Sequence, residues 1–164
     1  MTRPPVPTTR HRTASRRARR WIAALVSILG LSLASGALTS CEAVDPERAQ
    51  VRDLINQSRA QAGLSQLAPN ATLDLKADLW AQYLRSICAL KHSRLADGAP
   101  PNWYKLGENV GKGGSIPQIH TAYLNSPSHR ANIMDPVFTQ VGTAAVWGNC
   151  NGYRTVFTVQ EFMK

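Results

Sequence analysis

The sequence predicts an α+β fold, in which helices pack on an antiparallel sheet that ends in a C-terminal hairpin. Apolar residues recur at the helical spacing of three and four between residues 45 and 134, and two β-prone runs follow between residues 138 and 162. Helices first and strands last is an order typical of the α+β class. The chain of 164 residues is long enough for one domain with a sizeable core behind a leader segment, but not for two.

Residues 1–40 have the composition of an export signal. They hold seven of the 19 Lys and Arg residues and no acidic residue, so residues 41–164 carry 12 basic and 10 acidic side chains. A nucleic-acid-binding domain needs a basic surface on its folded part, so we expect no nucleic-acid partner. Residues 1–20 form a basic n-region and residues 21–38 an uncharged apolar h-region, which is the layout of a secretory signal.

The end of this segment, Leu38-Thr39-Ser40-Cys41, resembles a bacterial lipobox. In lipoproteins the Cys of this motif is modified with lipid and becomes the new N-terminus. Cys41 is therefore the predicted lipidation site, and the membrane is the predicted partner. An uncleaved signal anchor and plain secretion remain as alternatives. The predicted organisation is an export signal (1–40), an anchor with a short linker (41–47) and a domain (48–164).

The domain starts with two predicted helices. Asp45 can cap the first helix, Pro46 suits its first position, and Gly63 ends it. Residues 64–70 form a connector, and the second helix covers about residues 72–90. This second helix has apolar residues on two faces, which predicts that it is buried between two layers. The second of these faces consists of Leu75, Leu79, Tyr83 and Leu90.

The next part of the chain is predicted to mix loops with short helices. Residues 93–105 contain breakers and read as irregular. Glu108 then lies in a predicted glycine-flanked turn, where Asn109 is a residue that tolerates a left-handed backbone. Ser115 can cap a third helix, and residues 126–134 form a fourth, short helix that begins with Ser-Pro.

The last part of the chain is β-prone. Residues 138–147 and 153–162 are rich in β-branched and aromatic residues, and the five residues between them, 148–152, are typical of turns. Two such runs joined by a short turn predict a hairpin.

Two cysteines, Cys88 and Cys150, remain in the domain if Cys41 carries lipid. Outside the cytoplasm an even pair of cysteines usually forms a disulfide, and this one would close a loop of 62 residues. Two alternatives stay open. The thiols could be buried and free, or Cys88 could be a nucleophile paired with His92, four residues further along a helix.

Three histidines and one acid are the candidate functional residues. His92 lies at the C-terminal end of the second helix, His129 lies in the first turn of the short helix, and Glu108 lies between them in the sequence. Imidazole and carboxylate groups suit a divalent transition metal, but their spacing matches no local metal motif. From spacing alone, these are scattered surface or capping residues. His120 is expected on a helix surface.

Several segments, in this order, resemble the CAP superfamily, which includes cysteine-rich secretory proteins, antigen 5 and pathogenesis-related 1 proteins. They are LINQSRAQAGL (54–64), LKHS (90–93), GENV (107–110), YLNSPSHRANIM (123–134), FTQVG (138–142) and VQEF (159–162). The resemblance covers roughly residues 48–162 and is similar to the bacterial branch of the family. It implies an α–β–α sandwich around a small antiparallel sheet, with a central cleft.

In eukaryotic members, two His and two Glu line that cleft and can hold a divalent cation. By resemblance, His92 corresponds to the first His and Glu108 to the Glu of GEN. The second Glu has no counterpart in the helix over residues 116–125, and Val137 stands where the second His is expected. His129 can serve in its place. The resemblance thus implies at most a triad of His92, Glu108 and His129 for zinc or another divalent cation.

The resemblance implies an exported, non-enzymatic protein of the cell envelope, anchored in the membrane or secreted, that binds a divalent cation or a small apolar ligand such as a lipid. One alternative is a protease-like hydrolase that uses His92, Glu108 and His129. Another is a structural or adhesion module, in which Glu108 only ties a loop to a helix by hydrogen bonds.

Overall fold

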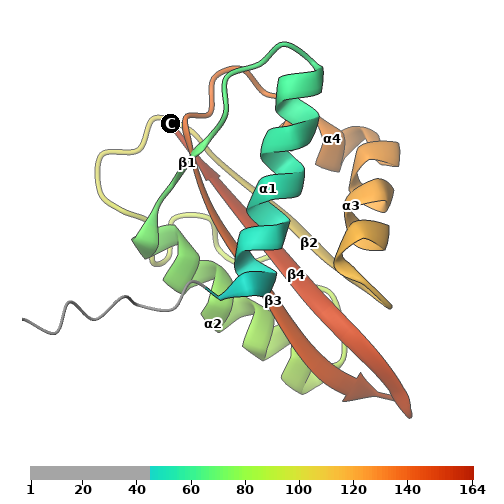
Figure 1. Cartoon of the computed structure of the whole chain (residues 1–164). Helices are drawn as coiled ribbons and strands as arrows, with labels where there is room; N and C mark the ends of the chain where they lie inside the picture. The colour runs from blue at the N-terminus through green and yellow to red at the C-terminus, as the bar shows by residue number, and fades with distance from the viewer. Residues whose placement is uncertain (1–44) are drawn as a thin grey trace, which may run out of the picture. The chain divides into compact units, whose positions relative to one another are not determined.

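The computed structural model describes residues 45–164 and shows helices on both faces of a mixed sheet (Figure 1). The predicted leader and Cys41 lie outside the described residues. In chain order the elements are α1 (Pro46–Gln61), β1 (Ala68–Pro69), α2 (Ala71–Ile87), β2 (Leu106–Gly113), α3 (Ile116–Asn125), α4 (Pro127–Ile133), β3 (Gln140–Cys150) and β4 (Tyr153–Met163).

The helices begin where the sequence predicts. The Asp45 carboxylate accepts hydrogen bonds from the backbone N–H groups of Glu47 and Arg48, which are among the groups left unpaired by the first turn of α1. Asn70 caps α2 and Ser115 caps α3 in the same way. Ser126 stands at the cap position of α4, but its hydroxyl makes no capping hydrogen bond.

The end of α2 differs from the prediction. The helix stops at Ile87 instead of continuing to residue 90, because Cys88 takes a left-handed conformation with φ of 51°. That conformation ends a helix. His92 consequently lies in the loop after α2 and not on the helix.

The sheet has the strand order β1-β3-β4-β2. The predicted hairpin is confirmed as β3 and β4, but the five-residue turn is wrong. Only Asn151 and Gly152 form the turn, both with positive φ, since Asn-Gly is the pair that a two-residue hairpin turn favours. The predicted connector 64–70 contains β1, which pairs in parallel with β3, so the sheet is not wholly antiparallel.

The predicted turn around Glu108 is also wrong, because this segment is strand β2. It pairs antiparallel with β4 along its whole length. The glycines here serve close packing and not a turn: a Cβ atom on Gly111 would lie 2.6 Å from the Tyr123 hydroxyl of α3. Sequence reasoning took glycine as a sign of a turn, whereas the tertiary contact with α3 requires it.

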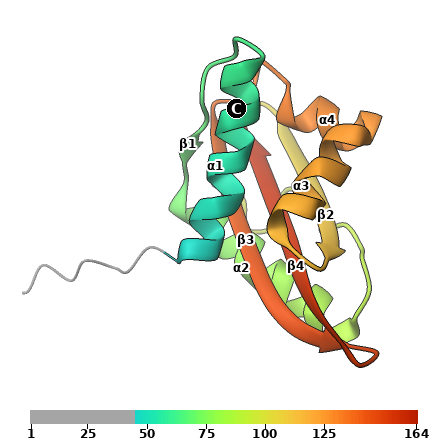
Figure 2. The same cartoon turned by 45° about the vertical axis from the view of Figure 1, so that its right-hand side comes forward.

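The helices form two layers, one on each face of the sheet, which confirms the α–β–α sandwich (Figures 1 and 2). One core cluster joins α1, α3 and α4 to the sheet, and the other joins α2 to the opposite face. The helix α2 lies very close to β3, since a Cβ on Gly142 would approach the backbone carbon of Leu73 to 2.1 Å.

The prediction that α2 is buried on two faces is wrong. Its second apolar face is exposed, with Leu75 at 59% and Leu79 at 60% of their full accessibility. Among the described residues, α2 is the outermost layer on its side of the sheet (Figure 2). Periodicity cannot separate a helix covered on both sides from one with an apolar outer surface.

The described residues carry a complete core of their own. Both clusters consist of residues between Val51 and Phe162, and the disulfide lies between the same limits. A core of its own is what a unit needs in order to fold alone. None of the helices between residues 45 and 164 is long and apolar enough to cross a bilayer.

Candidate functional site

Glu108 is the centre of the candidate site. Strand β2 buries its side chain to 1% exposure, and the loop after α2 supplies its partners. His92 Nδ1 lies 2.6 Å from Glu108 Oε1, and the Ser93 backbone N–H donates to both carboxylate oxygens at 3.0 and 3.3 Å. The carboxylate therefore ties the loop to the sheet, while the His92 side chain remains 61% exposed.

A second buried carboxylate, Glu161 of β4, lies directly opposite Glu108 in the β2–β4 register. The Lys76 ammonium of α2 donates one hydrogen bond to the Glu161 carboxyl group and another, at 2.9 Å, to Ser93 Oγ. Burial raises the pKa of Glu161 to about 8, with Lys76 acting against this shift and the nearby Glu108 adding to it. Glu161 therefore holds a proton near neutral pH, chiefly because it is buried.

Sequence reasoning missed Lys76 and Glu161. Lys76 is three residues after Leu73, on the buried side of α2, and Glu161 interrupts a run of buried strand residues. A charged residue in an apolar pattern is a signal for a buried ion pair, because a lone charge would be too costly there. That signal was present in the sequence, but only the strand register identifies the two residues as partners of one site.

His129 occupies the other side of the candidate site, on α4. Its Nδ1 lies 2.9 Å from Ser126 Oγ, and its ring packs 5.0 Å from the ring of Tyr123. Burial lowers the pKa of His129, and the charge of His92 lowers it further. His129 is therefore neutral near pH 7.

Asn109 joins the two sides of the site. It was expected to be a turn residue, but it is fully buried in β2. Its side-chain amide donates to the His129 carbonyl at 3.1 Å and to Gln160 Oε1 at 2.9 Å, and its oxygen accepts from Asn132 Nδ2 at 2.9 Å. A buried amide needs partners for all its polar atoms, and this network supplies them.

His120 is not on a helix surface, as the sequence suggested, but in the interface between α1 and α3. It is 7% exposed, and its Nε2 lies 2.8 Å from Ser58 Oγ of α1. Burial lowers the pKa of His120. The structure therefore does not bring His120 together with His92 and Glu108.

The described residues do not fit a three-ligand metal site as they are arranged. No group of three or more His, Cys, Asp or Glu side chains in residues 45–164 has the geometry of a metal site. The buried Glu108 carboxylate already accepts from His92 and Ser93, and His129 Nδ1 is bonded to Ser126. The triad of His92, Glu108 and His129 for zinc stays a prediction, in which the two imidazoles would bind through Nε2, because their Nδ1 atoms are already hydrogen-bonded.

The predicted disulfide is confirmed. Cys88 and Cys150 are bonded, with their Cα atoms 5.6 Å apart. The bond joins the end of α2 to the tip of the β3–β4 hairpin. It excludes the alternative in which Cys88 is a free nucleophile paired with His92.

A hollow of about 320 Å³ adjoins the site on the α2 side. Its apolar walls are Leu79 and Trp80, and Arg94 and Asp97 supply charges. Ser93, whose backbone binds Glu108, also lines it. The hollow thus places an apolar surface next to the buried polar network.

Known proteins resemble this chain in sequence and in fold. The uncharacterised protein YkwD of Bacillus subtilis (strain 168) is 31% identical over 106 residues, which are 59% of this chain and 41% of that protein. The chain thus matches about two fifths of the length of this relative. An outer surface protein of Borrelia burgdorferi superposes with a TM-score of 0.59 at 20% identity, over 73% of this chain and 93% of that one.

An extracellular protein of Bacillus anthracis with an SCP domain superposes equally well. Its TM-score is 0.59 at 23% identity, over 73% of this chain and 40% of that one. At these identities the two structures show the shared fold alone. The family model of the cysteine-rich secretory protein family, CAP, matches residues 52–162. That match covers both helix layers and the sheet, and this chain belongs to the CAP family.

Proposed function

We propose that this chain is an exported protein of the bacterial cell envelope, held at the membrane by lipid on Cys41. Two relatives are named as an extracellular and an outer surface protein, which supports export. A disulfide between Cys88 and Cys150 is typical of proteins outside the cytoplasm. The lipobox-like segment that ends at Cys41 supports the anchor.

The domain binds a small apolar molecule and does not catalyse a reaction. The observation that carries this proposal is the hollow of about 320 Å³, with Leu79 and Trp80 as walls, beside a network already satisfied by its own bonds. Ligand sites are concave, mostly apolar and equipped with a few polar groups. Arg94 at the hollow is a cation that can pair with an acidic head group.

One observation favours hydrolysis as a second candidate. His92 Nδ1 is bound to a buried carboxylate, as in a general base whose other ring nitrogen faces the substrate. However, the nearby hydroxyls are engaged elsewhere, Ser93 with Lys76 and Ser126 with His129. A hydrolase at this site would therefore have to activate water.

Melting curves of the oxidised domain with dodecanoate, an apolar chain with one carboxylate, test the binding proposal. We expect saturating dodecanoate to raise the melting temperature by about 5 °C. Arg94→Gln should reduce this shift, whereas Arg130→Gln, a matched change on α4, should leave it intact. No shift with the unmodified domain would contradict the proposal.

Two further arms of the same experiment separate the alternatives. Turnover of p-nitrophenyl acetate that Glu108→Gln and His92→Ala both abolish, in folded protein, would establish a hydrolase. A rise in melting temperature with Zn²⁺ after EDTA treatment, lost in Glu108→Gln and His129→Ala, would restore the metal triad. A structural or adhesion module would respond to none of the three probes.

A further inference from the structure

The outer side of α2 and the loop after it form an unusually apolar surface. Of the ten large apolar side chains that are exposed among the described residues, six lie here. They are Leu75, Leu79, Tyr83, Ile87, Leu90 and Leu95, all between 37% and 60% exposed. We call these six residues the α2 outer surface. Scattered apolar residues are normal on a protein, but a contiguous group marks an interaction site.

Cations border this surface. Residues 83–97 contain three exposed cations, Arg85, Lys91 and Arg94, and one exposed acid, Asp97, while Asp78 of α2 is paired with Arg48. Lys112 of β2 adds a fourth cation, because its ammonium donates to the Cys88 carbonyl at 2.7 Å. An apolar stripe with cations at its edge complements the surface of a bilayer that contains anionic phospholipid.

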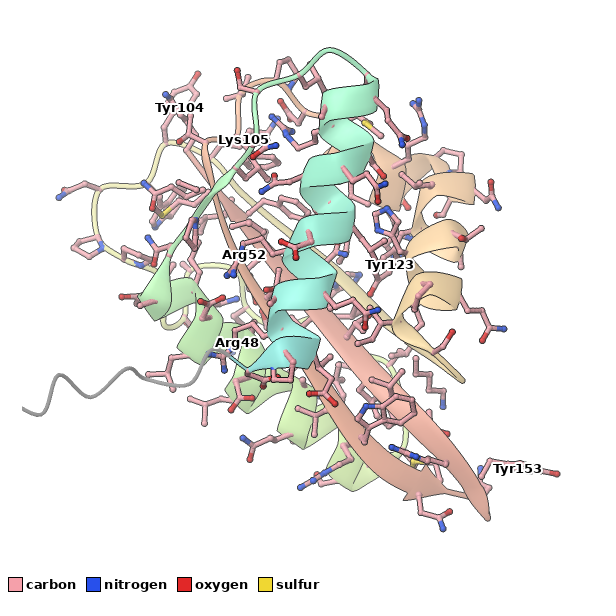
Figure 3. All side chains as sticks on the ribbon, in the orientation of Figure 1. Arg48, Arg52, Tyr104, Lys105, Tyr123 and Tyr153 are labelled. Carbon is pink, nitrogen blue, oxygen red and sulfur yellow. A yellow bond between two sulfur atoms is a disulfide. The ribbon has the colours of Figure 1, made fainter. Side chains whose placement is uncertain are left out.

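The start of α1, which follows the predicted anchor by a few residues, lies close to α2. Arg48, in the first turn of α1, lies 3.9 Å from the Asp78 carboxylate of α2, beside Leu79 in the sequence (Figure 3). Cys41 is five residues before the start of α1 at Pro46, and five residues span at most about 17 Å. A lipid on Cys41 would therefore keep α2 within reach of the bilayer.

We infer that the α2 outer surface docks on an anionic lipid bilayer beside the Cys41 anchor. This inference rests on the anchor proposed above. The leucines and Tyr83 enter the head-group region, and the four cations pair with phosphates. The hollow that Leu79 and Arg94 line opens on the same surface, so docking places its mouth at the lipid. The tether makes this weak contact effective, because it raises the local concentration of the membrane.

The test couples the domain to vesicles chemically, so that it does not depend on lipidation in the cell. Oxidised residues 41–164 are attached through the free Cys41 thiol to a maleimide phospholipid. The vesicles contain brominated phosphatidylcholine, alone or mixed with phosphatidylglycerol. All proteins carry Trp103→Phe/Trp147→Phe, which leaves Trp80 as the one tryptophan of residues 41–164. Quenching of its emission by the brominated chains then reports the approach of α2, since Trp80 follows Leu79.

We expect strong quenching with phosphatidylglycerol, and less without it or at high salt, which screens the cations. Leu75→Glu/Leu79→Glu should lower the docking equilibrium by about tenfold or more, because it removes two large apolar contacts. Tyr104→Glu/Val137→Glu is the matched control: it makes the same charge change at exposed apolar residues outside the surface, and Figure 3 shows Tyr104 in the loop before β2. Circular dichroism and unchanged melting temperatures check that both variants fold.

Equal quenching of the wild type and Leu75→Glu/Leu79→Glu would overturn the inference. So would dimerisation of the untethered domain that this variant abolishes, measured by sedimentation equilibrium, since the surface would then bind a second copy. If docking occurs on vesicles but Cys41 carries no lipid in cells, the proposed lipid anchor is wrong and the inference that the α2 outer surface binds the bilayer is kept. If Cys41 carries lipid in cells but the domain does not dock on vesicles, the inference about the α2 outer surface is wrong and the proposed lipid anchor is kept.

Discussion

At the scale of single residues, the buried carboxylates decide the chemistry of the site. Glu108 accepts hydrogen bonds from His92 and Ser93, and Glu161, on the opposite strand, is bonded to Lys76 of α2. The arrangement has one fixed cation for two acids, so protonation of Glu161 is the means by which the site avoids a surplus of negative charge. Stability should therefore depend on pH through this residue.

Glu161→Gln should flatten the pH dependence of stability between pH 5 and pH 8. The pKa of Glu161 is raised to about 8 in the folded protein from an ordinary value of 4.5, so the folded state keeps a proton that the unfolded chain loses. This contribution is complete below pH 4.5 and is mostly lost as pH rises to about 8, a change of about 4 kcal/mol. Urea unfolding across this range measures it.

The neutral variant lacks the titration, and its unfolding free energy should fall less with pH than that of the wild type. Asp53→Asn, a change at an exposed carboxylate of α1, is the control and should keep the wild-type slope. A Glu161→Gln protein with the same slope as the wild type would show that Glu161 is ionised in the fold.

At the scale of elements, α2 is held against the sheet by two devices. The absence of a side chain on Gly142 lets the helix approach β3, and the disulfide fixes its C-terminal end to the hairpin. The loop 93–105, which carries no helix or β-strand, then returns the chain to β2. The position of His92 over Glu108 depends on both devices, because His92 follows the last turn of α2 by only a few residues.

Cys88→Ala/Cys150→Ala should lower the free energy of unfolding by about 4 kcal/mol. The bond closes a loop of 62 residues, and its loss restores chain entropy to the unfolded state. Urea unfolding of the wild type with and without dithiothreitol checks the magnitude. The double variant should not respond to dithiothreitol, and any response there would mean that the reductant acts elsewhere than on this bond.

At the scale of the whole molecule, the chain carries a predicted export signal, the proposed anchor residue Cys41 and a domain with its own core. The predicted boundaries at residues 40 and 47 stay predictions, since they fall outside the described residues or at their edge. The domain itself has exposed apolar residues on α2 and a polar site beside them, so attachment to a membrane would bring lipid close to both.

Cys41→Ser should change how the full chain is attached. In a bacterium that processes lipoproteins, the wild type should be found in the membrane fraction and should incorporate labelled palmitate. The variant should incorporate none, whereas Cys88→Ala/Cys150→Ala should still be labelled. Equal labelling of wild type and Cys41→Ser would contradict the anchor, and secretion of unlabelled wild type would establish the plain-secretion alternative.

The sequence by itself determined the fold class and the starts of the helices, and it favoured the disulfide over two alternatives. The helix starts depend on local signals, since Asp45 and Ser115 cap helices through bonds to the next turn. The family followed from motifs that keep their order along the chain. For these features, short-range physics and long-range packing require the same residues.

Only the tertiary structure decided what surrounds each side chain. Gly111 suggests a turn by its residue type, yet it lies in strand β2. The strand has a glycine there because Tyr123 of α3 leaves no room for a side chain. Lys76 and Glu161 are 85 residues apart in sequence and meet only because α2 covers β4. The outer face of α2 has the periodicity of a buried helix and is nevertheless exposed, since periodicity records where apolar residues lie on a helix and not what covers them.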